Sequence, residues 1–447
     1  MFGTGIGPTQ YFHRLAVVPL AVLTLAGVAA CDSDSKSSST APSTTGTTAP
    51  AGDSAKECVT DVDKVIATKP TAAMTSASLP TDLVAKLDAA AQSSFKEAAA
   101  PGAIVGVRSP QGTWIMAYGV AEPSGVTKPV TGKPMTADMH TRIGSVTKTF
   151  TGTVILQLVQ QRKLSLNDPI DKYFPGVPNG DKITLRHLAT MTSGIASYTK
   201  STKFTDVLFA RPQTSFTPDE LIAIGLSESP IFPPGERFDY SNTNTHLLGK
   251  VIEKVTGEPV EDVFKKMIFD PLGLANTSWP AGSTAIPEPY PQGFTLQGDT
   301  ATPENPSNAT NWNPSWGWTS GELISNMPDL LTYGRALGTG QGLLDPATQA
   351  ERLRSVPGPS GYGITMGCDA GWVGHGGELP GYNTSLFYDT ASDTTVVVQT
   401  NSDIPSGDCP AGATLTDNPT QAVCSSPATR MFVALSTALG HPFTPAG

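Results

Sequence analysis

The chain has 447 residues and a formal net charge of −10, from 29 Lys and Arg residues against 39 Asp and Glu residues. This length is enough for one large domain or two ordinary ones, with a sizeable hydrophobic core. An acidic chain repels the phosphate backbone of nucleic acids, so the composition argues against nucleic-acid binding. After residue 30, no stretch reaches the roughly 20 apolar residues that a transmembrane helix requires.

The N-terminus predicts an export signal. Arg14 precedes a long apolar run, and the two together are typical of a secretory signal peptide over residues 1–30. The run ends in the segment Val28 to Cys31, which resembles the lipobox of bacterial lipoproteins. This resemblance implies that Cys31 becomes the lipid-modified first residue of the mature protein. The alternative is an ordinary cleavage site followed by an incidental cysteine.

The next segment predicts a tether and a short arm. Residues 31–57 consist mostly of Ser, Thr, Ala, Pro, Gly and Asp, which cannot build a hydrophobic core and therefore predict disorder. An arm with little pattern follows over 58–79, before the folded domain over 80–447. We therefore expect an exported, monomeric domain that a lipid anchor holds at the outer face of the bacterial cell membrane.

The remaining cysteines fit an exported protein. Four are left after Cys31, and an even number predicts two disulfides, for which there are three connectivities. Cys409 and Cys424 flank a loop without a periodic pattern, so we predict a bond between them, and Cys58 then pairs with Cys368 by elimination. The six histidines do not cluster at the spacing of metal ligands, so we expect neither a metal nor another cofactor.

Strand patterns lie at both ends of the domain, and helical patterns lie in its middle. The predicted elements, in chain order, are a helix from Thr81, strands over 103–108 and 114–120, helices over 145–161 and 242–257, strands over 361–367, 372–375, 384–389 and 394–400, and a helix over 428–439. The simplest assembly is an α+β fold, with one antiparallel sheet from about 80–140 and 355–447, flanked by helices. An all-helical domain over about 141–354 is then inserted, and the cleft between the two parts would hold the ligand.

Ser145 and Lys148 begin the long apolar helix and carry the first chemical signal. Residues three apart lie on one face of a helix, one turn apart. A lysine among apolar helix faces loses its charge more readily because burial lowers its pKa, so it can accept the proton of a serine nucleophile. Alone this pattern is weak, because a serine helix cap followed by a solvated lysine gives the same spacing.

Two further motifs strengthen this interpretation. Tyr240 precedes the second apolar helix, and a tyrosine near a lysine ammonium is favoured as a phenolate that can move protons. Asn242 offers an amide to the substrate or to Lys148. His375 and Gly377 belong to a His-Gly-Gly sequence at the end of a strand pattern, where glycines let a substrate backbone approach closely.

Together the motifs occur in the order S-x-x-K, Y-x-N and H-x-G, at residues 145–148, 240–242 and 375–377. In this they resemble the family of serine β-lactamases and penicillin-binding proteins. Within it they are similar to the branch of class C β-lactamases, D-alanyl-D-alanine carboxypeptidases and related esterases. The resemblance covers about residues 80–440 and implies the β-lactamase/transpeptidase-like fold, which agrees with the sheet and helical insert expected above.

The resemblance also implies the catalytic roles. Ser145 is the nucleophile that becomes acylated, Lys148 takes its proton, and Tyr240 is the partner acid and base. Whether Lys148 or Tyr240 is the primary base stays open at this point.

The binding roles follow in the same way. Asn242 positions the substrate, and His375 and Gly377 line the opposite wall. The backbone N–H groups of Ser145 and Glu378 would form the oxyanion hole. A Glu378 side chain that faces the cleft would repel a free substrate carboxylate, whereas one that points away would leave only its N–H group in play.

We therefore expect a cell-envelope serine hydrolase that forms an acyl-enzyme on ester, amide or D-amino-acid peptide substrates, either small molecules or peptidoglycan-like peptides. The family's D-Ala-D-Ala carboxypeptidases place hydroxyl side chains around the H-x-G motif, where this chain has Gly376 and Glu378, so an esterase or amidase is the preferred interpretation. One alternative is a true β-lactamase, although the family's β-lactamases usually carry Lys at the position of His375. Another is a non-catalytic penicillin-binding or sensor lipoprotein.

Overall fold

A computed structural model describes residues 57–69, 77–124, 131–409 and 424–444. The expected signal peptide, Cys31 and nearly all of the tether lie outside these residues. Within the described ranges, no helix is both long enough and apolar enough to cross a membrane.

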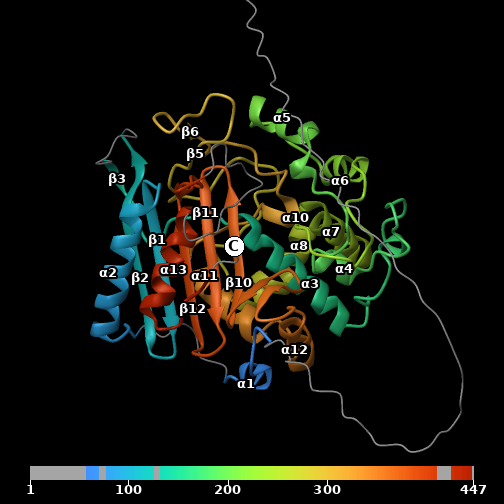
Figure 1. Cartoon of the computed structure of the whole chain (residues 1–447), viewed down its shortest axis with the longest axis horizontal. Helices are drawn as coiled ribbons and strands as arrows, with labels where there is room; N and C mark the ends of the chain where they lie inside the picture. The colour runs from blue at the N-terminus through green and yellow to red at the C-terminus, as the bar shows by residue number, and fades with distance from the viewer. Residues whose placement is uncertain (1–56, 70–76, 125–130, 410–423, 445–447) are drawn as a thin grey trace, which may run out of the picture. The chain divides into compact units, whose positions relative to one another are not determined.

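The central layer is an eight-stranded sheet with the strand order β3-β2-β1-β12-β11-β10-β9-β8 (Figure 1). All neighbouring strands are antiparallel. Its strands are β1 (Gly102–Ser109), β2 (Gly112–Pro123), β3 (Gly132–Pro134), β8 (Ser360–Tyr362), β9 (Gly367–Asp369), β10 (Trp372–Leu379), β11 (Tyr382–Asp389) and β12 (Thr394–Thr400). Because β1 pairs with β12, the N-terminal hairpin and the C-terminal strands form one sheet, as the sequence predicted.

The strand predicted over 361–367 is divided in the structure. A turn, in which the Gly363 N–H donates to the carbonyl of Met366, separates β8 from β9. As a result β9 pairs with β10 only along Trp372–Gly374. The rest of β10, residues 375–379, pairs with β11 along one edge. Along its other edge, no strand lies beside it in the described part of the chain.

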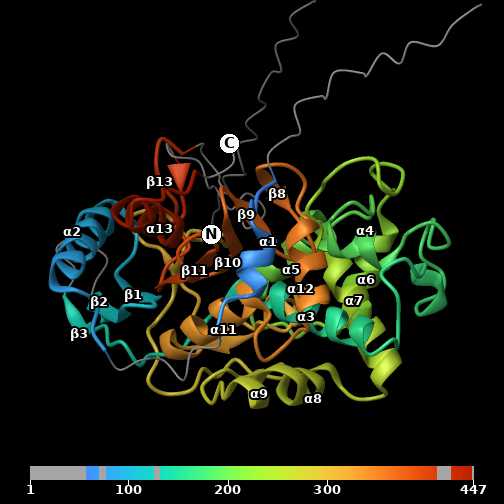
Figure 2. The same ribbon diagram turned by 90° about the horizontal axis from the view of Figure 1, so that it is seen from below.

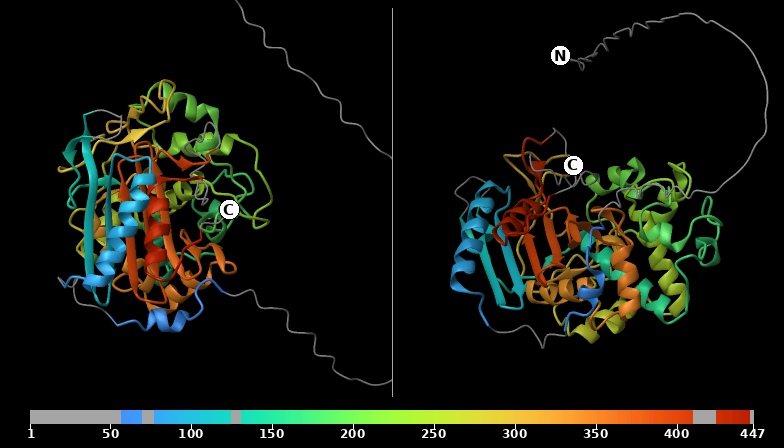
Figure 3. Two further views of the ribbon diagram at one scale, coloured as in Figure 1. Left: turned by 60° about the vertical axis from the view of Figure 1, so that its left-hand side comes forward. Right: turned by 60° about the horizontal axis from the view of Figure 1, so that its bottom comes forward.

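Helices cover both faces of the sheet. On one face α2 (Thr81–Glu97) and α13 (Pro427–Ala438) lie side by side, as Figures 2 and 3 show. Alternate residues of β1, such as Val105, pack against these helices, while Ile104 faces the larger core with α11 (Met327–Thr339) on the other side. The two-residue period of a strand thus supplies apolar side chains to two cores.

The segment between the two groups of strands is mainly helical and contributes little to the large sheet. Its helices are α3 (Thr147–Gln160), α4 (Leu185–Ala189), α5 (Thr202–Ala210), α6 (Pro218–Ser227), α7 (Asn242–Thr256), α8 (Val260–Phe264), α9 (Asp270–Leu272), α10 (Trp318–Gly321), α11 and α12 (Pro346–Arg354). It also holds two short strand pairs, β4 (Thr141–Arg142) with β7 (Ile324–Ser325) and β5 (Phe294–Thr295) with β6 (Ser307–Asn308). The helix α3 is buried along nearly its whole length, which explains why its sequence is apolar on all sides.

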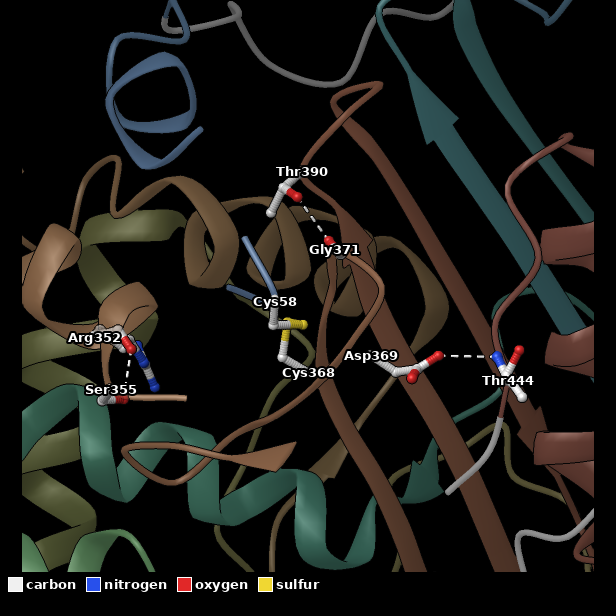
Figure 4. Close-up of a disulfide and its surroundings, with 8 residues drawn as sticks. All are labelled: Cys58, Arg352, Ser355, Cys368, Asp369, Gly371, Thr390 and Thr444. Carbon is white, nitrogen blue, oxygen red and sulfur yellow. Dashed lines mark hydrogen bonds between the residues drawn. A yellow bond between two sulfur atoms is a disulfide. The ribbon is translucent and has the colours of Figure 1, made fainter. Parts of the chain in front are cut away.

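Two disulfides join the expected cysteines. Cys58, in the arm that leads to the short helix α1 (Val62–Ile66), is bonded to Cys368 of β9 (Figure 4). Cys409 is bonded to Cys424, which begins the two-residue strand β14 (Cys424–Ser425) opposite β13 (Ser406–Gly407). The first bond ties the arm to the edge of the large sheet that lies beside the site described next.

Candidate active site

Ser145 lies in a single 3-10 turn, Gly144–Val146, that leads directly into α3. Gly144 has a φ of +52°, in the left-handed region that favours glycine. A Cβ atom at Gly144 would lie 2.4 Å from the backbone nitrogen of Glu378. Glycine is therefore required here both by the backbone conformation and by the contact with β10.

The facing strand also needs glycine. A Cβ atom at Gly377 would lie 1.9 Å from the carbonyl oxygen of Ile143 and 3.2 Å from the backbone nitrogen of Ser145. The serine turn and β10 are thus in direct backbone contact. This contact brings the backbone N–H groups of Ser145 and Glu378 onto neighbouring segments, which is the arrangement that an oxyanion hole needs.

Lys148 is placed one turn into the helix, beneath the serine. Its Nζ lies 3.0 Å from Ser145 Oγ and 2.8 Å from the carbonyl oxygen of Ser320 in α10, to which it donates. Its side chain is fully buried, with 0% exposed. Burial disfavours the charged ammonium and lowers the pKa of Lys148 well below its usual value. A neutral amine in this position can accept the Ser145 hydroxyl proton.

Tyr240 lies immediately before α7 and faces the same two residues. The Lys148 Nζ is 4.9 Å from the centre of the Tyr240 ring. Burial raises the pKa of Tyr240, and a hydrogen bond with Ser145 only partly offsets this shift. The resting site therefore favours a neutral phenol beside a neutral amine, not the phenolate expected beside an ammonium. Of the two candidates for the primary base, these directions favour Lys148.

His375 is buried, with 8% exposed, and its two ring nitrogens have partners. Nε2 lies 3.0 Å from the hydroxyl of Tyr362 in β8, and Nδ1 contacts the carbonyl oxygen of Gly376. Burial lowers the pKa of His375 to about 3, so the imidazole is neutral near pH 7. If Nδ1 donates to the carbonyl, Nε2 accepts a hydrogen bond from the Tyr362 hydroxyl. His375 then acts as a fixed wall of the site and not as a proton carrier.

Asn242 forms part of the helical wall. Its Nδ2 donates to Thr199 Oγ1 at 3.1 Å, and its backbone N–H donates to Ser197 Oγ at 3.0 Å. The amide is thus oriented by the loop before α5, while Asn242 still lines the cleft. This supports a position for substrate binding more than a contact with Lys148.

Ser145, Tyr240, Asn242, His375 and Glu378 are among the residues that line one cleft of about 810 Å³. Lys148 and Gly377 are not in this lining, because Lys148 is buried behind Ser145 and Gly377 packs against the serine turn. In the described part of the chain, no three His, Cys, Asp or Glu side chains are grouped so that they could hold a metal ion.

The side chain of Glu378 lies on the other face of β10 from Gly377. In the β10–β11 register Gly376 is opposite Ser385 and Glu378 is opposite Asn383, and the Asn383 side chain accepts the backbone N–H of Ala428 at the start of α13. Glu378 therefore lies on the α13 face of the sheet. Glu378 is among the residues that line the cleft. Because its side chain lies on the face away from the serine turn, its backbone N–H is the part of Glu378 that lies next to Ser145.

Three contributors to the site carry no motif in the sequence. The carbonyl of Ser320 accepts from Lys148, the hydroxyl of Tyr362 contacts His375, and Thr199 holds Asn242. A backbone carbonyl leaves no signal in a sequence, since any residue could supply it. Tyr362 lies in a predicted strand, but only the pairing of β8 with β9 brings it to His375.

The chain matches the family described as Beta-lactamase over residues 82–417, which is more than half of its length. PbpX of Bacillus subtilis (strain 168), whose name assigns it to the penicillin-binding proteins, is 30% identical over 261 residues; the match covers 58% of this chain and 61% of PbpX. This chain therefore spans less than two thirds of the length of that relative.

Solved structures are similar as well. The D-stereospecific amidohydrolase from Streptomyces sp. is 32% identical, with a TM-score of 0.64, over 71% of this chain and 94% of that chain. The D-amino acid amidase from Ochrobactrum anthropi SV3 is 22% identical, with a TM-score of 0.67, over 80% of this chain and 99% of that chain. At this lower identity the likeness concerns the fold alone.

Proposed function

Because this chain belongs to the Beta-lactamase family of serine hydrolases, we propose that it hydrolyses amide bonds of D-amino-acid amides or short peptides through an acyl-enzyme on Ser145. The observation that carries this proposal is the distance of 3.0 Å between Ser145 Oγ and the Nζ of a fully buried lysine. A nucleophile and a base within hydrogen-bond distance are the minimum that acyl transfer requires.

In the acylation step, the neutral amine of Lys148 accepts the Ser145 hydroxyl proton as Oγ attacks the substrate carbonyl carbon. The negative charge that develops on the carbonyl oxygen is stabilised by the backbone N–H groups of Ser145 and Glu378. The phenol of Tyr240 then donates its proton to the departing nitrogen, and the Lys148 ammonium returns a proton to Tyr240. The C–N bond breaks and an ester to Ser145 remains.

In the deacylation step, the same groups act in reverse on water. Tyr240 and Lys148 take a proton from the water molecule as its oxygen attacks the ester, and Ser145 Oγ regains a proton as it leaves. The product is a free acid. His375 takes no proton in this scheme, because burial keeps its imidazole neutral.

One observation supports an amide substrate over a substrate with a free carboxylate near β10, namely the similarity to a protein that is named a D-stereospecific amidohydrolase. The side chain of Glu378 lies on the face of β10 away from the serine turn, so its carboxylate gives no argument for or against a substrate carboxylate.

The proposal places the enzyme outside the cell, held at the membrane through lipid on Cys31. Its support is the lipobox-like segment before Cys31 and the even number of cysteines after it. The disulfide between Cys58 and Cys368 fits an oxidising compartment.

The test compares turnover of D-alanine amide, L-alanine amide and benzylpenicillin by the purified domain and by Ser145→Ala. We expect hydrolysis of the D-amide above the L-amide, abolished in Ser145→Ala. Fast turnover of benzylpenicillin with no amide hydrolysis would contradict the proposal and indicate a β-lactamase. A stable penicillin adduct without any turnover would indicate a sensor.

A further inference from the structure

We infer that the cleft has a second, apolar compartment on the α13 face of the sheet, which binds an apolar group of the substrate's acyl part, with Phe443 as a specificity-determining residue. This inference rests on the acyl-enzyme proposed above. We call this part of the cleft the α13-side compartment, and its walls are Phe387, Phe432 and Phe443.

Three phenylalanine rings form one cluster in this compartment. The ring centres of Phe387 in β11 and Phe432 in α13 are 4.8 Å apart, and that of Phe443 lies 5.0 Å and 5.1 Å from them. All three residues line the cleft that Ser145 also lines. Phe387 and Phe432 are 9% and 0% exposed, whereas Phe443 is only partly buried. An apolar or aromatic group that leaves water would therefore pack mainly on the Phe443 ring, and burying its apolar surface there is favourable.

Glycines on β10 let the ring cluster approach the strand. In the strand register Gly374 is opposite Phe387 and Gly376 is opposite Ser385, so both glycines lie on the α13 face. A Cβ atom at Gly374 would lie 2.0 Å from the carbonyl oxygen of Leu386 and 2.8 Å from a ring carbon of Phe387. The Phe387 ring therefore packs directly against the β10 backbone, with no room for a side chain at Gly374.

The path from the nucleophile leads over the free edge of β10. Because β9 ends its pairing at Gly374, residues 375–379 have no described strand beside them. The Gly377 backbone contacts the serine turn on one face, and Glu378 lines the cleft on the other. An acyl group attached to Ser145 would cross this edge to reach the rings.

Hydrogen bonds hold Phe443 in place. Its backbone N–H donates to Ser436 Oγ at 2.9 Å, and the next N–H, of Thr444, donates to Asp369 Oδ2 at 2.9 Å (Figure 4). Two residues before Phe443, the carbonyl of His441 accepts a hydrogen bond from Trp372 Nε1 at 2.9 Å. The segment after α13 is therefore fastened to β9 and β10, and the Phe443 ring forms a fixed wall.

The experiment uses two esters with the same leaving group, p-nitrophenyl acetate and p-nitrophenyl 3-phenylpropanoate. We expect kcat/KM of the wild type to be at least about tenfold higher for the phenylpropanoate, since a single methylene in an apolar pocket already discriminates by about 10–200-fold. In Phe443→Ala this ratio should fall about tenfold. The matched control is Phe95→Ala, a partly buried ring of α2 that lies outside the cleft lining and should leave the ratio unchanged.

A wild-type ratio near one would overturn the inference without any variant, and so would an unchanged ratio in a folded Phe443→Ala protein. The outcome is separable from that of the proposed function. If acetate hydrolysis depends on Ser145 but the ratio is near one, only the compartment is refuted. If Ser145→Ala retains acetate hydrolysis, the proposed function itself fails.

Discussion

Replacement of Gly377 by alanine tests the contact between β10 and the serine turn. The added Cβ would lie 1.9 Å from the carbonyl oxygen of Ile143, whereas ordinary contacts begin near 3.4 Å. The two backbones must therefore separate by about 1 Å or more, and a misplacement of about 1 Å can lower a rate about 10²-fold. Loss of one oxyanion-hole donor costs about 10²–10³-fold in kcat. We expect kcat/KM of Gly377→Ala to fall in this range.

The assay is p-nitrophenyl acetate hydrolysis, with thermal unfolding measured in parallel because overpacking costs about 1–3 kcal/mol of stability. The matched control is Gly367→Ala on the neighbouring strand, where the nearest atom would be 3.7 Å from the new Cβ. We expect that control to keep its activity. A folded Gly377→Ala protein with kcat/KM within twofold of the wild type would refute the reasoning.

Three further predictions follow from the same structure. Because burial lowers the pKa of Lys148, its neutral amine can act as the base, and kcat/KM should fall as the pH drops through this pKa, which a pH-rate profile checks. Lys148→Arg places a side chain that stays charged at the same position and should lose turnover. Tyr362→Phe removes the partner of His375 Nε2 and should lower the free energy of unfolding by about 1–3 kcal/mol in urea titrations; an unchanged value would contradict it. Cys31→Ala should move the protein from the membrane fraction to the soluble fraction, and unchanged membrane retention would exclude the anchor.

Local patterns in the sequence were sufficient for most of the fold. The apolar periodicity before Gly257 predicted α7, and the alternating strands around Gly112 predicted the β1–β2 hairpin. Both signals come from residues that are near in sequence. The short pairs β4–β7 and β5–β6 were not predicted, because two-residue strands carry no period and depend on distant partners.

The site was predictable where chemistry is tied to a motif, and less so where it depends on burial or register. The spacing of Ser145 and Lys148 indicated their contact, since helix geometry fixes it. The protonation of Tyr240 could not be predicted, because it depends on how deeply the assembled fold buries the phenol. The face of Glu378 follows from the pairing of β10 with β11, which single-sequence patterns do not specify.

The central claim, that Ser145 is the acylated nucleophile, is tested most directly by mass spectrometry. The purified domain and Ser145→Ala are treated with a fluorophosphonate, digested and mapped. The account predicts one adduct, on the peptide that contains Ser145 in the wild type, and none in Ser145→Ala. An adduct on another residue, or equal labelling of the Ser145→Ala protein, would contradict it.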